Sequence, residues 1–141
     1  ADAMLNRSAR VTGVITQALL DVEIAHQRLT SLEVVSTMHQ RKARMADLAD
    51  GFIMMPGGSG SLDEFFEVFT WLQLGYHNKP CAILNVAGYF DQLLSFIDSA
   101  ASKGFINPEH VSAIVVAENA DALIHKITNY SSQITAKWVE A

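Results

Sequence analysis

The stretch FIMMPGGSGSLDEFFE, residues 52–67, runs from a short apolar segment through three glycines into an aromatic and acidic segment. A short apolar run bounded by glycines is typical of a buried strand. The residues that follow place apolar side chains at the i, i+3, i+4 and i+7 spacing of a helix: Leu62, Phe65, Phe66, Phe69 and Leu72. The stretch therefore predicts a strand, a glycine-rich turn and a helix, which is the repeating unit of parallel α/β folds.

The same order recurs along the whole chain. Apolar strand-like runs lie at residues 11–16, 32–37, 51–55, 81–85 and 113–117, and helical patterns lie at 38–49, 61–75, 89–103 and 120–130. Alternating strands and helices predict an α/β fold, a Rossmann-like, doubly wound parallel sheet with helices on both faces. For 141 residues we expect one domain, residues 1–141. The chain begins without methionine, on a segment that reads like the end of a helix, so we expect this domain to be incomplete at its N-terminus.

Composition limits the classes of ligand and the compartment. The net charge of −5 excludes an extended basic surface for a nucleic acid polymer, although RKAR at 41–44 forms one local basic cluster that suits a small anion. The single cysteine, Cys81, cannot form an intrachain disulfide, which indicates a reducing compartment. We find neither a signal peptide nor an apolar run of about 18 residues, so we expect a cytoplasmic protein with no membrane association.

The glycine loop at 57–61 matches neither of the common nucleotide motifs. It lacks the Gly-Lys-Ser/Thr of a Walker loop, and Asp63 stands where a dinucleotide fingerprint needs its third glycine. What remains is a strand end, glycines that allow close approach to the backbone, and a helix N-terminus with free N–H groups, which together favour an anion. The alternative is structural, since Ser61 and Glu64 have the spacing of a capping box, with Ser61 as N-cap and Glu64 at the third helical position.

A second candidate cluster lies on the helix predicted at 38–49. Here Arg41 and Lys42 share a face with apolar residues, and cations near a helix N-terminus oppose its dipole, so a negative partner is expected. Binding of an anionic ligand is about as good an interpretation as the structural alternatives, which are a solvated basic face or pairing with Asp47 and Asp50. Because parallel strands end at one edge of a sheet, this cluster and the glycine loop can line one crevice.

The helix predicted at 61–75 carries Glu64, Glu67 and Trp71 together on the face opposite its apolar stripe. A large aromatic residue beside two carboxylates, away from the core, predicts a ligand wall or a subunit contact, although a single exposed tryptophan can also be incidental. A metal site is not expected, since the five histidines show no i, i+3 or i, i+4 pairing and there is no second cysteine.

Two of these segments carry a family resemblance. MHQRK at 38–42 and PGGSGSLDE at 56–64 resemble the paired motifs M-H-E-R-K and P-G-G-x-G-T-x-x-E of the LOG family of cytokinin-activating phosphoribohydrolases, which are often labelled lysine decarboxylase-like. Similar segments extend over nearly the whole chain. Gln40, Ser61 and Thr16 depart from the family's Glu, Thr and Pro, and the family's additional N-terminal strand–helix–strand segment has no counterpart here.

The resemblance implies hydrolysis of the N-glycosidic bond of a nucleoside 5′-monophosphate, typically an N6-modified AMP, to the free base and ribose 5-phosphate. It implies that Arg41 and Glu64 are catalytic, without a metal or cofactor, in a homodimer whose active site lies near the subunit boundary. The substrate-binding residues that it implies are Met38, Lys42, Gly57, Gly58, Ser59, Gly60, Ser61 and Glu67. A carboxylate near C1′ would stabilise an oxocarbenium-like transition state. The alternative is a nucleotide-binding or sensing module of the same fold without turnover.

Overall fold

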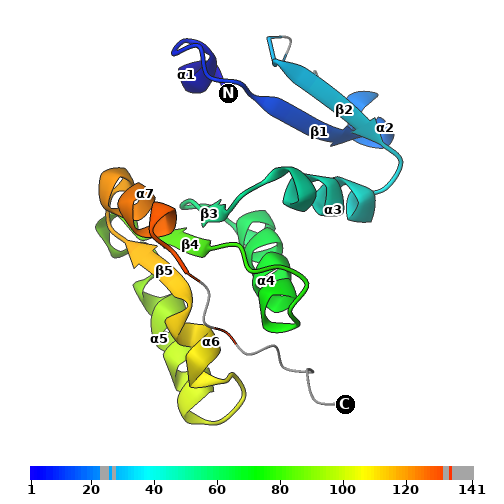
Figure 1. Cartoon of the computed structure of the whole chain (residues 1–141). Coiled ribbons are helices and arrows are strands. Elements are labelled where there is room, and N and C mark those ends of the chain that lie inside the picture. Colours follow the sequence, from blue (N-terminus) through cyan, green and yellow to red (C-terminus); the bar gives the residue numbers. More distant parts are fainter. Residues whose placement is uncertain (23–25, 27, 132–133, 135–141) are drawn as a thin grey trace. The chain divides into compact units, whose positions relative to one another are not determined.

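The computed structural model describes residues 1–22, 26, 28–131 and 134, and the chain divides into two compact units, Ala1–Ala49 and Asp50–Ala141 (Figure 1). The first unit contains a two-stranded parallel sheet in which Thr12 pairs with Ser31 and Thr16 pairs with Val35. Its elements in chain order are α1 (Asp2–Leu5), β1 (Thr12–Thr16), α2 (Gln17–Leu20), β2 (Ser31–Val35) and α3 (Met38–Leu48).

A capping box starts α3. The hydroxyl of Thr37 accepts the Gln40 N–H at 3.2 Å, and the Gln40 side-chain oxygen accepts the N–H groups of Ser36 and Thr37 at 3.0 and 3.2 Å. Reciprocal bonds of this kind satisfy donors that a helix start otherwise leaves without partners. The helix that carries Arg41 and Lys42 therefore has a fixed first turn.

The second unit is a three-stranded parallel sheet in the order β3-β4-β5. Phe52 of β3 pairs with Cys81 of β4, which in turn pairs with Ile114 of β5. The elements are β3 (Phe52–Met54), α4 (Ser59–Gln73), β4 (Cys81–Leu84), the 3-10 turn η1 (Val86–Gly88), α5 (Asp91–Ser102), α6 (Pro108–Ser112), β5 (Ile114–Ala117) and α7 (Ala120–Thr128).

Helices cover both faces of this sheet. Successive side chains of a strand point to opposite faces, and along β4 the first three, Cys81, Ala82 and Ile83, are all buried. Cys81 and Ile83 belong to the larger core, which α4 and α5 complete with four buried side chains, Phe65, Phe69, Leu72 and Ile97. Ala82 packs instead with Leu123 of α7. Figure 1 shows α7 in orange on the other side of the strands from α4 in green.

The structure confirms the parallel α/β fold and each of the strands and long helices expected from the sequence, with boundaries that shift by one or two residues. The five strands belong to two sheets, one in each unit. That the chain forms a single domain stays a prediction. Among the helices that the structure describes, none has both the length and the apolar character needed to cross a bilayer.

The predicted capping box at Ser61 is wrong. The N-cap of α4 is Gly58, at φ −102° and ψ −149°, and no side chain caps the helix. The first helical bond already runs from the Leu62 N–H to the Gly58 carbonyl at 3.2 Å. Ser61 is therefore the third helical residue, and Glu64 lies in the second turn, where the helix dipole acts on it less than the sequence suggested.

The burial of Cys81 leads to a chemical prediction. Its side chain is fully buried, and burial raises the pKa of the thiol to about 12. Because only the thiolate reacts, we expect the folded protein not to react with a thiol reagent such as DTNB, whereas protein unfolded in guanidinium should react fully. Rapid labelling of the folded protein would show that Cys81 does not belong to the core.

His77 fastens the loop after α4 to that helix. Its Nδ1 accepts the Lys79 N–H at 3.1 Å, so Nε2 carries the proton and donates to the Val68 carbonyl at 2.9 Å. Burial, together with the charge of Lys79, lowers the pKa of His77 from its ordinary value of 6.5. The neutral ring is thus the form that the folded state favours.

This lowered pKa makes the unfolding free energy depend on pH. Below 6.5 the unfolded chain takes up a proton that the folded state binds less readily, so His77 contributes stability above this pH that is lost progressively as the pH falls toward the folded-state pKa. We expect wild type to lose more stability than His77→Gln between about pH 7.5 and about pH 5.5, measured by urea unfolding. Equal losses would contradict this role, since the other histidines are the same in both proteins.

Candidate functional site

The glycine loop lies between the end of β3 and the start of α4. Gly58, Ser59 and Gly60 are exposed, and a Cβ added at Gly58 or Gly60 would meet nothing within 4 Å. Gly57 has a different role, because a Cβ there would overlap with the hydroxyl of Ser61. The loop therefore combines one glycine needed for packing with two that leave the backbone open at the N-terminus of a fifteen-residue helix, an arrangement suited to an anion.

The carboxylates of α4 lie on one side of the helix, away from its buried stripe. Phe65, Phe69 and Leu72 are buried as expected. Glu64 is exposed in the second turn, and Glu67 and Trp71 are half-buried on the following turns. Spacings of three and four residues place these three side chains on one helix face.

A tyrosine from another strand end contacts the glycine loop. The Tyr89 hydroxyl donates to the Gly57 carbonyl at 2.9 Å across a sequence separation of 32 residues. The sequence interpretation missed Tyr89. The signal was present, since NVAGYF begins where the strand predicted at 81–85 ends, and the carboxyl ends of neighbouring parallel strands meet at one edge of the sheet.

The basic cluster lies on α3 in the first unit. Arg44 is occupied by Glu33 of β2, with Nε to Oε2 at 2.6 Å and Nη2 to Oε1 at 2.9 Å. The Arg44 guanidinium holds the pKa of the Glu33 carboxyl below its usual value. Arg41 and Lys42 are half-buried, and Met38, at the start of the helix, is exposed.

Arg41 has a polar atom without a partner. Its Nη1 lies 3.9 Å from the sulfur of Met38, while its Nε is buried and has no hydrogen-bond partner within the described part of the chain. An unpaired buried donor is unfavourable, and an added carboxylate or phosphate would relieve it. This is the property expected of a residue that holds an anion.

The structure places each predicted cluster within its own unit. Met38, Arg41 and Lys42 belong to the first unit, whereas the loop at 57–61, Glu64 and Glu67 belong to the second. The pairing of Arg41 with Glu64 and the shared crevice stay predictions. In the residues described by the structure, no group of three or more His, Cys, Asp or Glu side chains could hold a metal ion.

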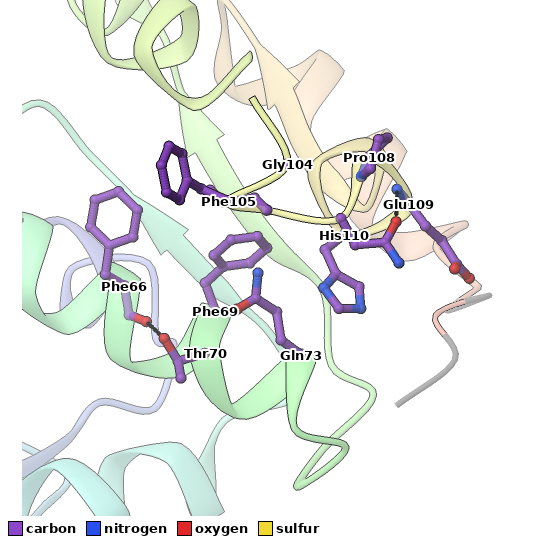
Figure 2. Close-up of a pocket in the computed structure, with 11 residues that line it drawn as sticks. Phe66, Phe69, Thr70, Gln73, Gly104, Phe105, Pro108, Glu109 and His110 are labelled. Carbon is purple, nitrogen blue, oxygen red and sulfur yellow. Dashed lines mark hydrogen bonds between the residues drawn. The ribbon is translucent and has the colours of Figure 1, made fainter. Parts of the chain in front are cut away.

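A separate cavity of about 630 Å³ lies between α4 and the segment at 104–110 (Figure 2). Phe66, Phe69 and Phe105 give it an aromatic lining, and the buried His110 also lines it. It contains none of the predicted site residues, so it is distinct from the glycine loop.

A parallel α/β unit with an open glycine loop between a strand end and a helix is typical of nucleotide- and phosphate-binding α/β proteins. Family comparison makes this specific, because the family model described as "Possible lysine decarboxylase" matches residues 1–127. The chain belongs to this family.

Curated relatives confirm the resemblance to the LOG phosphoribohydrolases. A cytokinin riboside 5′-monophosphate phosphoribohydrolase of Arabidopsis thaliana is 46% identical over 130 residues, which are 92% of this chain and 61% of the relative. An enzyme of the same name from Rhodococcoides fascians is 48% identical over 128 residues, 90% of this chain and 65% of the relative. Another from Arabidopsis thaliana is 44% identical over 142 residues, 99% of this chain and 65% of the relative. The chain thus spans less than two thirds of the length of these relatives.

Proposed function

We propose that this chain is part of a phosphoribohydrolase that cleaves the N-glycosidic bond of an N6-modified adenosine 5′-monophosphate, releasing the free base and ribose 5-phosphate. The names of the relatives support this substrate class. The structural observation that carries the proposal is the open glycine loop at the N-terminus of α4.

The loop would bind the 5′-phosphate. The N–H groups of Ser59, Gly60 and Ser61 belong to the first turn of α4, where backbone donors have no partners within the helix and the dipole favours negative charge. The open space at Gly58 and Gly60 gives the phosphate oxygens access to this backbone. Lys42 would add a positive charge from α3.

Glu64 would act at the sugar. As the C1′–N9 bond breaks, the base departs with the bonding electrons and takes up a proton, and positive charge develops on the ribose before water adds to C1′. A carboxylate near C1′ stabilises that charge and orients the water. A guanidinium group is a poor proton donor, so the proposed role of Arg41 is to position Glu64 or the nucleotide.

The proposal includes a homodimer in the cytoplasm. The half-buried Trp71 beside Glu67 supports a subunit contact on the face of α4 that carries both residues. The buried thiol of Cys81 is compatible with a reducing compartment. Light scattering coupled to gel filtration tests the dimer directly.

The activity is tested by incubating the protein with AMP and N6-isopentenyl-AMP and measuring ribose 5-phosphate, with adenosine as the matched control that lacks the phosphate. We expect release from the monophosphates and little from adenosine, because the loop binds the phosphate. Saturable AMP binding without product would favour the nucleotide-binding module instead. If the protein shows neither AMP binding nor turnover, both the phosphoribohydrolase and the nucleotide-binding module are overturned.

A further inference from the structure

We propose that Tyr89 is a positioning residue for the glycine loop: its hydroxyl holds the Gly57 carbonyl and thereby directs the Gly58 N–H toward the bound anion. The inference rests on the proposed function for the identity of that anion, the 5′-phosphate of a nucleotide. It adds a residue outside both sequence motifs to the site.

The Tyr89 ring packs against the core. It stands edge-on against the ring of Phe90, with centroids 4.8 Å apart and an interplanar angle of 89°. Phe90 is 3% exposed and belongs to the core cluster of α4 and α5, whereas Tyr89 is 58% exposed. The hydroxyl is thus presented at the surface by a side chain whose base is packed.

A buried amide fixes the turn that carries Tyr89. Asn85 follows β4 directly, and its N–H donates to the Ala117 carbonyl at 2.8 Å. Its side-chain oxygen accepts the Phe90 N–H at 2.7 Å, and its side-chain nitrogen donates to the Asp91 carboxylate at 2.7 Å. Both ends of the turn are therefore tied to one side chain.

The backbone of this turn adopts an uncommon conformation at two residues. Ala87 and Gly88 have positive φ angles of 51° and 71°. The left-handed region is unfavourable for alanine and persists only where the surroundings determine it. The hydrogen bonds of Asn85 provide that determination, so the position of Tyr89 does not depend on the glycine loop.

The glycine loop, in contrast, has few side chains of its own that could fix its backbone conformation. Gly57 and Gly58 have no side chains, and glycine loses more conformational freedom on folding than any other residue. The carbonyl and the N–H of a trans peptide point in opposite directions, so a bond to the Gly57 carbonyl also fixes the direction of the Gly58 N–H. That N–H then points away from Tyr89 next to the open space at Gly58. Tyr89 would raise affinity by preorganising the loop.

The test is Tyr89→Phe, which removes the hydroxyl and keeps the ring on Phe90. We expect the Kd for AMP, measured by calorimetry on the full chain, to rise about 2- to 12-fold, the range for one lost hydrogen bond. KM should rise by a similar factor with kcat near wild type, because the phosphate is held equally in the ground and transition states. Tyr76→Phe, on the exposed loop after α4, is the matched control and should leave both unchanged.

A second measurement does not depend on the ligand. In the ligand-free protein, the NMR signals of the Gly58 and Ser59 amides should shift and show larger amplitude motion in Tyr89→Phe, while the signal of Ala82 in the core stays the same. If wild type binds no AMP, the proposed function fails, but these amides still decide whether Tyr89 positions the loop. Unchanged amide signals, or a lower Tm with unchanged amides, would overturn the inference.

Discussion

We expect Glu64→Gln to lower kcat for N6-isopentenyl-AMP by about 10²- to 10⁴-fold, the range for loss of a group that assists proton transfer or water attack. The substitution keeps the size and shape of the side chain and removes only its charge. Glu64 is exposed, so the free energy of unfolding should change by no more than about 0.5 kcal/mol. A steady-state assay of ribose 5-phosphate and a urea titration of the same preparation measure the two effects separately.

Asp63→Asn is the matched control for this experiment. Asp63 is an exposed carboxylate on the same helix, directly before Glu64, and successive helical residues point about 100° apart. We expect it to retain most of the wild-type kcat. If both variants lose activity equally, the total charge of this helix matters and not Glu64 in particular. If both variants keep wild-type activity, Glu64 does not belong to the catalytic site.

Phe69→Ala should have the largest effect on stability. Phe69 is 2% exposed and lies parallel to Phe65, with ring centroids 6.0 Å apart, in the core between α4 and the sheet. Replacing a buried phenylalanine by alanine removes the transfer free energy of the ring and leaves a cavity, which destabilises a protein by about 3 to 5 kcal/mol. Because a domain of this kind is stable by about 5 to 15 kcal/mol, the variant should be close to unfolding at 37 °C.

The control for this prediction is Phe96→Ala on α5. It makes the same chemical change in a helix, and so the same change in helix propensity, but Phe96 is 67% exposed. Urea unfolding followed by circular dichroism should show a loss within about 0.5 kcal/mol for this variant. Losses of similar size at both positions would show that Phe69 is not part of a packed core.

The apolar runs in the sequence were sufficient to locate the strands and long helices. Cys81 to Leu84 gave a clear signal because a central parallel strand is buried on both faces and carries no polar alternation. Helices α2 and α6 have only four or five residues, too few for an apolar period to repeat, and they were not predicted as separate elements. The loop at 57–61 and the cluster at 41–44 follow strand ends, as the sequence predicted, and their part in a functional site stays a prediction.

Two similar sequence patterns had different outcomes at the helix starts. Thr37 with Gln40, and Ser61 with Glu64, both fit the spacing of a capping box, but only the first pair forms one. The sequence does not show which residue adopts the extended backbone of an N-cap. In α4 the N-cap is Gly58, which has no side chain to cap with, and the helix begins three residues earlier than the pattern suggested.

The contacts that periodicity could not reveal join residues far apart in the chain. Arg44 pairs with Glu33 across a helix and a strand, and Tyr89 reaches Gly57 from another strand end. The first shows that Arg44 of the basic cluster is already paired, whereas Arg41 has a buried Nε without a partner in the described part of the chain. The second shows that the loop is held by a residue outside the motifs that identified it.

Because Gln40 carries an amide, the hydrogen bonds that cap the start of α3 do not depend on pH. A glutamate, as in the M-H-E-R-K pattern, would accept the N–H groups of Ser36 and Thr37 most strongly while ionised, and would bring a negative charge next to Arg41. An amide is neutral and does not titrate in this pH range. The first turn of α3 therefore keeps the capping hydrogen bonds of Gln40 in acidic solution, and the charge of the Arg41 guanidinium is not neutralised by its neighbour in the sequence.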